Sequence, residues 1–215
     1  MNAATPIALD QEAALASVLR SLTSDFGPTF DDETIKTFLD HSYAELAGHA
    51  KDANYLPLLA GRFARQRLTA LARVEGRHRD GTPVVLFLCT HNSGRSQMAL
   101  GFFAHHAGDA AIAWSGGSHP AESINTAAID AMLERGIDIS TEFPKPWTTE
   151  VLKAADVVVT MGCGDECPYF PGKRYEDWEL DDPAGLDLHA VRPIRDEIER
   201  KVLELIADLG VPSRG

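Results

Sequence analysis

The sequence has no long apolar run and no excess of basic residues. Its longest uninterrupted apolar stretch, at 84–89, has six residues, whereas a membrane-spanning helix needs about 20. Lysine and arginine number 20 against 32 aspartates and glutamates, so the formal net charge of the 215 residues is −12. Nucleic acids and anionic lipids are bound largely through basic residues. We therefore expect neither a membrane protein nor a nucleic-acid-binding protein.

Cysteine is also scarce, and the first residues carry no export signal. The three cysteines are Cys89, Cys163 and Cys167, and a small odd number is a poor framework for disulfides. In a reducing compartment such cysteines are more often reactive or metal-binding than structural. The start, MNAATPIALD, has neither the basic nor the apolar region of a signal peptide. These features predict a cytoplasmic protein.

The charge divides the chain into two parts. Residues 1–80 carry 9 basic and 11 acidic side chains, whereas residues 81–215 carry 11 and 21. The stretch GRHRDGTP at 76–83 has the glycine, charge and proline that are typical of a linker. We therefore place a domain boundary between residues 80 and 81.

Apolar residues in the first part recur at helical spacing. Three stripes show this pattern, at 15–22, 35–46 and 56–71. Asp10 and Asp31 are residue types that cap helices, and Pro57 suits a first helical turn. The pattern predicts a small three-helix bundle. Three such helices bury little surface alone, so we expect them to pack on the second part or on a partner chain.

The second part alternates strands and helices. The predicted strands lie at 84–88, 111–115, 156–161 and 173–180, with a short edge segment at 138–140. The predicted helices lie at 95–106, 126–136, 148–154 and 189–209. This alternation predicts an α/β fold, a parallel sheet with helices on both faces. Ligands bind such sheets beyond the carboxyl ends of the strands.

The strand at 84–88 runs directly into the motif C-x5-R-S, in which Cys89 is followed by Arg95 and a helix. Five intervening residues let the backbone curl into a cup whose amide groups point at one tetrahedral oxyanion, with the helix dipole behind them. Gly94 and Asn92 suit a tight backbone, and Arg95 can bind two oxygens of the anion at once. The predicted oxyanion-binding residues are Thr90, His91, Asn92, Ser93, Gly94, Arg95 and Ser96.

Cys89 is the predicted nucleophile of this loop. The positive surroundings and the Ser96 hydroxyl favour its thiolate, which is placed to attack the central atom of a bound oxyanion. Far downstream, Asp182 precedes Pro183, which restricts its backbone. A carboxyl group at the mouth of an oxyanion site can act as general acid. Without the loop, Cys89 would be an ordinary buried cysteine and Asp182 part of an acidic turn.

Four segments carry a family resemblance: CTHNSGRSQMA at 89–99, SGGSHPAESINTAAIDAMLERGIDIS at 115–140, DVVVTMGCGDECP at 156–168 and WELDDPAG at 178–185. With them, residues 83–209 resemble the low-molecular-weight protein tyrosine phosphatase fold and, within it, the thioredoxin-coupled arsenate reductases. The resemblance implies a flavodoxin-like four-stranded parallel sheet and no bound metal or organic cofactor. The phosphatase branch, which is the alternative, has aromatic residues after Asp-Pro and a second cysteine before the arginine. Here Ala184 and Gly94 occupy those positions.

The resemblance implies a relay of three cysteines. Cys89 attacks arsenate, Asp182 protonates the departing oxygen, and Cys163 then attacks the Cys89 sulfur as arsenite leaves. Cys167 next attacks Cys163, and thioredoxin, supplied with electrons from NADPH by thioredoxin reductase, reduces the resulting disulfide. Only three residues separate these last two cysteines, fewer than in better-known members, so local unwinding must precede their bond. A low-molecular-weight thiol as reductant is the alternative.

Other ligands and roles follow from the same residues. Phosphate or sulfate is expected to fit the loop as arsenate does, because phosphate and arsenate are nearly isosteric. A zinc site is disfavoured, because no further cysteine and no nearby histidine completes a tetrahedral set around Cys163 and Cys167. An oxyanion sensor without catalytic activity is the remaining class.

Some reductases of this family carry a comparable N-terminal extension, which implies that residues 1–80 serve dimerisation and that the protein is a homodimer. The alternative is a DNA-binding module, for which four arginines of the third predicted helix are the evidence: Arg62, Arg65, Arg67 and Arg73. A basic helix is more often a solvated face. Residues 1–80 also have a net charge of only −2 and no wing-like strand pair.

Overall fold

A computed structural model describes residues 9–48, 53–77, 81–162 and 169–214. The helical part consists of α1 (Leu9–Phe26), α2 (Asp32–Ala47), the 3-10 turn η1 (Ala53–Tyr55) and α3 (Leu56–Val74). The strands that follow are β1 (Val84–Cys89), β2 (Ile112–Gly117), β3 (Val157–Met161) and β4 (Arg174–Asp177). The helices among and after them are α4 (Arg95–Ala107), η2 (Gly108–Ala110), α5 (Thr126–Leu133), α6 (Thr149–Ala154) and α7 (Leu188–Asp208).

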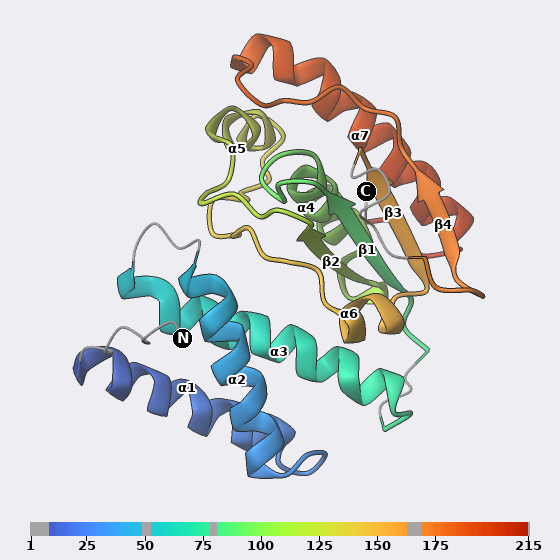
Figure 1. The fold of residues 1–215 in the computed structure, drawn as a ribbon. Helices are drawn as coiled ribbons and strands as arrows, with labels where there is room; N and C mark the ends of the chain where they lie inside the picture. Colours follow the sequence, from blue (N-terminus) through green and yellow to red (C-terminus); the bar gives the residue numbers. More distant parts are fainter. Residues whose placement is uncertain (1–8, 49–52, 78–80, 163–168, 215) are drawn as a thin grey trace.

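The four strands form one parallel sheet in the order β2-β1-β3-β4. All six residues of β1 are buried, as expected for a central strand that is covered on both faces. Helices α4, α5 and α7 cover one face of the sheet, and α6 and α3 lie on the other (Figure 1). The α/β fold that the sequence predicts, a four-stranded parallel sheet preceded by three helices, is confirmed.

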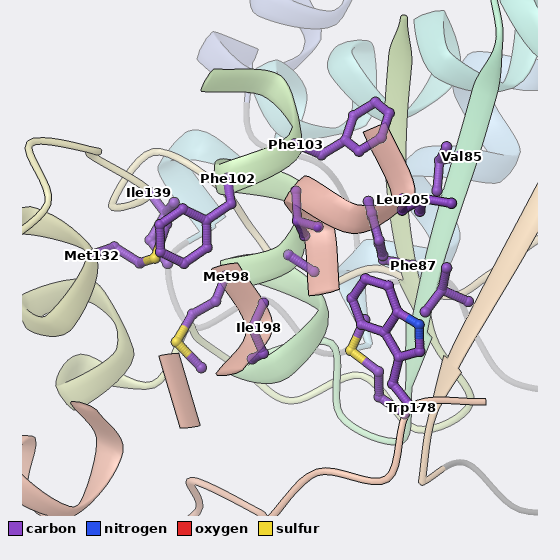
Figure 2. Close-up of a cluster of buried hydrophobic side chains, with 14 of the residues drawn as sticks. Val85, Phe87, Met98, Phe102, Phe103, Met132, Ile139, Trp178, Ile198 and Leu205 are labelled. Atoms are coloured by element: carbon purple, nitrogen blue, oxygen red, sulfur yellow. The ribbon is translucent and has the colours of Figure 1, made fainter. Parts of the chain in front are cut away.

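The larger core lies between the sheet and α4, α5 and α7. Figure 2 shows Phe87 of β1 between aromatic neighbours from distant parts of the chain. Its ring centroid lies 5.8 Å from that of Phe103 on α4 and 5.9 Å from that of Trp178, just after β4. Side chains of α4, α5 and α7 also belong to this cluster, among them Met98, Met132 and Ile198. This packing fixes the start of α4 at the carboxyl end of β1.

The three N-terminal helices have a second core, which extends into the α/β part. Phe143, from the loop before α6, is buried in this core beside residues such as Phe63 of α3. Ala70 of α3 is in turn buried in the cluster on the sheet face that α6 covers. The helices therefore pack on the α/β part, as expected. The boundary placed at 80/81 stays a prediction, because it adjoins residues 78–80, which lie outside the described part.

Several local predictions can be compared with the structure. Asp31 caps α2 by accepting a hydrogen bond from the Thr34 backbone N–H at 2.7 Å. Asp10 is not an N-cap, because α1 already includes Leu9 and Asp10 belongs to its first turn. The edge segment at 138–140 is also wrong: Asp138 accepts a hydrogen bond from the Ser140 N–H, which closes a turn in place of a strand.

The helix predicted to end at Gly136 ends at Leu133, three residues earlier. Gly136 has a φ of +73° and is the last residue of the turn that closes the helix. Among the residues that the structure describes, no helix is both long enough and apolar enough to cross a membrane.

Candidate active site

The loop between β1 and α4 carries the C-x5-R-S motif. Cys89, the last residue of β1, is buried and is a free thiol. Its Sγ lies 3.0 Å from the Ser96 Oγ and accepts a hydrogen bond from the Asn92 backbone N–H at 3.2 Å. Donors aimed at sulfur stabilise a thiolate over a thiol. The structure therefore places a hydroxyl and a backbone N–H within hydrogen-bonding distance of the Cys89 sulfur.

The loop carbonyls are held from outside the cup. The carbonyls of Thr90, His91 and Ser93 accept backbone hydrogen bonds of 2.8 to 2.9 Å from the segment 119–125. Because C=O and N–H point in opposite directions across a trans peptide, the N–H groups that follow these carbonyls face the inside of the cup. The Asn92 N–H on the Cys89 sulfur is one of them. This is the geometry of an oxyanion site built from backbone amides.

Asn92 holds the loop in shape. Its φ of +47° lies in the left-handed region, which is uncommon outside glycine but tolerated by asparagine. Its side chain is buried and makes three hydrogen bonds. The amide donates to the Ser96 Oγ at 2.9 Å, and its carbonyl oxygen accepts from the Lys145 backbone N–H and from the Gln97 Nε2. These bonds hold a conformation that would otherwise be strained.

Arg95 and Asp182 meet at the mouth of the cup. The guanidinium of Arg95, a buried residue, lies 3.2 Å from the Asp182 Oδ2 and donates to the Leu180 carbonyl. About half of the Asp182 side chain is exposed, with a relative accessibility of 51%. A small cavity above the sulfur is lined by Cys89, His91, Ser93, Gly94, Arg95, Asn125, Asp182, Pro183 and Ala184.

The structure brings together most of the residues that the sequence singles out. Cys89, Arg95 and Asp182 share this one cavity, although 93 positions separate the first from the last. Thr90 is on the cup's edge, where its Oγ1 donates to the Gly162 carbonyl at 3.1 Å.

Cys163 and Cys167 lie outside the described residues, so the relay between them stays a prediction. Gly162, the last described residue before them, is beside Arg95. A Cβ added to Gly162 would lie 2.9 Å from the Arg95 Nη1.

Three residues that position this site escaped prediction, and Asn125 and Gln97 are the first two. Asn125 caps α5 through its Oδ1 and also donates from Nδ2 to the Pro183 carbonyl at 3.1 Å, which holds the Asp182 loop. Asn125 before an apolar helix is an N-cap signal, but its second bond depends on the fold. Gln97 donates from Nε2 to the backbone oxygens of Asn92 and Phe143.

Lys145 is the third such residue. Only 3% of it is exposed, and its Nζ lies 3.3 Å from the Ser115 Oγ and 3.4 Å from the Phe143 carbonyl. Burial lowers the pKa of Lys145 to about 8. Sequence reasoning treats a lysine as exposed, so its segment, FPKPW at 143–147, carries no signal of this burial.

The comparisons with known families match both parts of the chain. Residues 84–212 match the family described as low molecular weight phosphotyrosine protein phosphatase, and residues 15–72 match the protein-tyrosine-phosphatase-like N-terminal domain. The chain belongs to the low molecular weight phosphotyrosine protein phosphatase family. The resemblance found in the sequence is therefore confirmed.

Three relatives illustrate what this member of the family is similar to. The thioredoxin-dependent arsenate reductase Cg_ArsC1' of Corynebacterium glutamicum superposes with a TM-score of 0.83 at 41% identity, over 92% of this chain and 97% of its own. An arsenate reductase of Halalkalibacterium halodurans is 42% identical over 129 residues, covering 55% of this chain and 91% of its own. A low molecular weight protein tyrosine phosphatase from T. tengcongensis has a TM-score of 0.53 at 28% identity, over 59% of this chain and 99% of its own.

The basic residues of α3 make contacts within the chain. Each of the four arginines has a protein partner in the structure: Arg62 with Glu142, Arg65 with Asp25, Arg67 with Glu150 and Arg73 with the Thr82 carbonyl. Three of these partners are carboxylates, so Arg62, Arg65 and Arg67 are paired with negative charge within the chain.

Proposed function

We propose that the protein reduces arsenate to arsenite, with Cys89 as the nucleophile. The observation that carries this proposal is the buried Cys89 thiol beneath a cup of backbone amides, with Arg95 and Asp182 paired at its mouth. Such a site binds one small tetrahedral oxyanion and excludes larger anions. Relatives named as arsenate reductases, one of them similar over nearly the whole chain, support the reductase branch of the family.

The first step joins the substrate to the enzyme. Arsenate lies in the cup, held by the amides of residues 90–96 and by the Arg95 guanidinium, which turns from Asp182 to two arsenate oxygens. The Cys89 thiolate then attacks arsenic, a sulfur–arsenic bond forms, and one arsenic–oxygen bond breaks. Asp182 donates a proton to the departing oxygen, which leaves as water. No metal or organic cofactor takes part in this step.

The second step transfers two electrons to arsenic. The Cys163 thiolate attacks the Cys89 sulfur, a disulfide forms, and the electron pair of the sulfur–arsenic bond remains on arsenic, which leaves as arsenite. The placement of Gly162 beside Arg95 supports this step, because Gly162 directly follows β3 and adjoins Cys163 in the chain. Cys167 then takes over the disulfide bond to Cys163 and releases the Cys89 thiol.

Thioredoxin is the proposed reductant of this final disulfide, with a low-molecular-weight thiol as the alternative. The thioredoxin dependence in the name of the Corynebacterium glutamicum relative supports this choice. Its electrons come from NADPH through thioredoxin reductase. Such a cycle needs a reducing compartment, so we place the protein in the cytoplasm.

The experiment that tests this function compares two activities of one preparation. Arsenate-dependent NADPH consumption is followed with thioredoxin and thioredoxin reductase, and hydrolysis of an aryl phosphate is measured beside it. We expect arsenate-dependent consumption that Cys89→Ser abolishes and that Cys167→Ser stops after one arsenite per chain. Hydrolysis without any arsenate-dependent consumption would reject the reductase in favour of the phosphatase. Normal turnover of Cys167→Ser with thioredoxin would reject the relay.

We also propose that the helical part of residues 1–80 forms a homodimer interface. At the start of α3, Tyr55 and Leu58 expose 62% and 58% of their surfaces to solvent. Large apolar side chains in such positions favour contact with a second protein surface. Light scattering coupled to size exclusion should give twice the chain mass of 23.3 kDa, and Leu58→Glu should reduce it. A full chain that elutes as a monomer would reject the dimer.

A further inference from the structure

The segment between α5 and α6 touches both α3 and the oxyanion loop. On its outer side, Arg62 of α3 donates to the Thr141 carbonyl at 2.5 Å and forms an ion pair of 2.7 Å with the Glu142 Oε1. The same guanidinium lies 5.1 Å from the ring centroid of Phe143. Residues 141–143 are therefore fixed to helix α3 by a carbonyl, a carboxylate and an aromatic ring.

The inner side of the same segment holds the loop. The Phe143 carbonyl accepts from the Gln97 Nε2 at 3.1 Å, and that amide also donates to Asn92. Two residues on, the Lys145 backbone N–H donates to the Asn92 Oδ1 at 3.0 Å. The left-handed backbone of Asn92 thus depends on where residues 143 and 145 lie.

Glu142 joins these two sides through its two oxygens. Its Oε1 pairs with Arg62, and its Oε2 lies 3.9 Å from the Lys145 Nζ. The Lys145 side chain is 4% exposed, and a buried ammonium is stable only with compensating negative charge and acceptors. In the described residues around this ammonium, Glu142 attracts the positive charge and Arg62 repels it. The carboxylate therefore keeps two cations together.

We propose that Arg62, Glu142 and Lys145 form an ionic strap through which helix α3 holds Asn92, and with it the oxyanion loop, in the anion-binding conformation. This inference rests on the oxyanion-binding role proposed above for residues 90–96. It makes the three residues positioning residues, since the described contact between the strap and the loop is the hydrogen bond from the Lys145 N–H to the Asn92 side chain. The N-terminal helices then set the affinity of the site for its anion.

The chain offers a matched pair of variants for this proposal. Glu142→Gln removes the charge at the centre of the strap. Glu150→Gln removes a carboxylate that pairs with Arg67 of α3 at 2.5 Å across the same contact between the two parts of the chain. The two carboxylates are similarly buried, with side-chain accessibilities of 24% and 16%. Only Glu142 lies beside the segment that bonds Asn92.

The measurement is the protection of Cys89 from iodoacetamide by inorganic phosphate, read on the Cys89 peptide by mass spectrometry. We expect Glu142→Gln to raise the phosphate concentration for half protection about fivefold, and Lys145→Met to raise it by a similar factor. Glu150→Gln should leave it within about twofold. The melting temperature of each variant is measured as well. Both Glu variants lose one ion pair of α3, so similar melting temperatures would show that a difference in phosphate affinity is not a difference in stability.

Two results with the variants would overturn the strap. One is an unchanged phosphate concentration in Glu142→Gln, and the other is an equal increase in Glu142→Gln and Glu150→Gln, which would indicate general loosening of the helices. Absence of protection in the unsubstituted chain would overturn the anion-binding role together with the strap. Because the readout is anion binding and not turnover, a failure of arsenate reduction alone would leave the strap supported.

Discussion

At the scale of single residues, the Ser96 hydroxyl is the closest side-chain partner described for the sulfur of Cys89, the proposed nucleophile. It lies 3.0 Å from the Cys89 Sγ, and a hydrogen bond to a charged group contributes about 1.5–3 kcal/mol. Ser96→Ala should therefore slow alkylation of Cys89 by iodoacetamide at pH 7 about tenfold. Ser93→Ala is the matched control, because Ser93 lines the same cavity and should leave the rate unchanged. Equal rates in both variants would contradict a role for the hydroxyl.

The conformation of Asn92 gives a second prediction at this scale. A left-handed backbone costs a residue with a β-carbon about 1–2 kcal/mol, whereas glycine adopts it freely. Asn92→Ala loses the side-chain hydrogen bonds and retains the backbone strain. Asn92→Gly loses the same bonds, but its backbone is not strained. Urea denaturation should show both variants destabilised, with the alanine variant less stable by about 1 kcal/mol. A glycine variant no more stable than the alanine variant would show that the φ of +47° carries no strain.

At the scale of elements, the start of α4 is packed against the Asp182 loop through a glycine. A Cβ added at Gly94 would lie 2.6 Å from the Pro183 Cγ, too close without movement of that loop. Gly94→Ala should therefore displace Asp182 and lower kcat/KM for arsenate on the order of a hundredfold, the effect of misplacing a catalytic group by about 1 Å. Gly48→Ala is the control, since its nearest neighbour lies 4.0 Å away. Full activity of Gly94→Ala would contradict the predicted position of the acid.

The helices, strands and caps also show which features of the fold the sequence could predict. The apolar run at 84–89 and the cap at Asp31 are local signals, and both elements form where they were expected. The prediction of an edge segment at 138–140 was wrong because the Asp138 side chain accepts a hydrogen bond from the Ser140 backbone. Such local bonds compete with strand pairing. The contacts of Gln97 and Lys145 escaped for another reason. Gln97 bonds Phe143, 46 positions away, and Lys145 bonds Asn92, 53 positions away, and only the folded chain brings such partners together.

At the scale of the whole molecule, burial of Lys145 couples the stability of the fold to pH. Its pKa is about 8 in the folded chain, against 10.5 for an ordinary lysine. Between these values the unfolded chain binds more protons than the folded chain, so the free energy of unfolding rises with pH. Below pH 8 both states are protonated and the dependence disappears. The largest slope that one such group supplies is about 1.4 kcal/mol per pH unit.

Lys145→Met should remove this contribution and retain most of the apolar volume. Urea denaturation of both proteins at pH 7, 8, 9 and 10 would measure it. The free energy of unfolding of the unsubstituted chain should rise relative to that of Lys145→Met between pH 8 and pH 10, with little change from pH 7 to pH 8. Other titrating groups act alike in both proteins and cancel in the difference. A difference independent of pH would mean that the ammonium is solvated, and a solvated lysine would not need Glu142 to remain in its place.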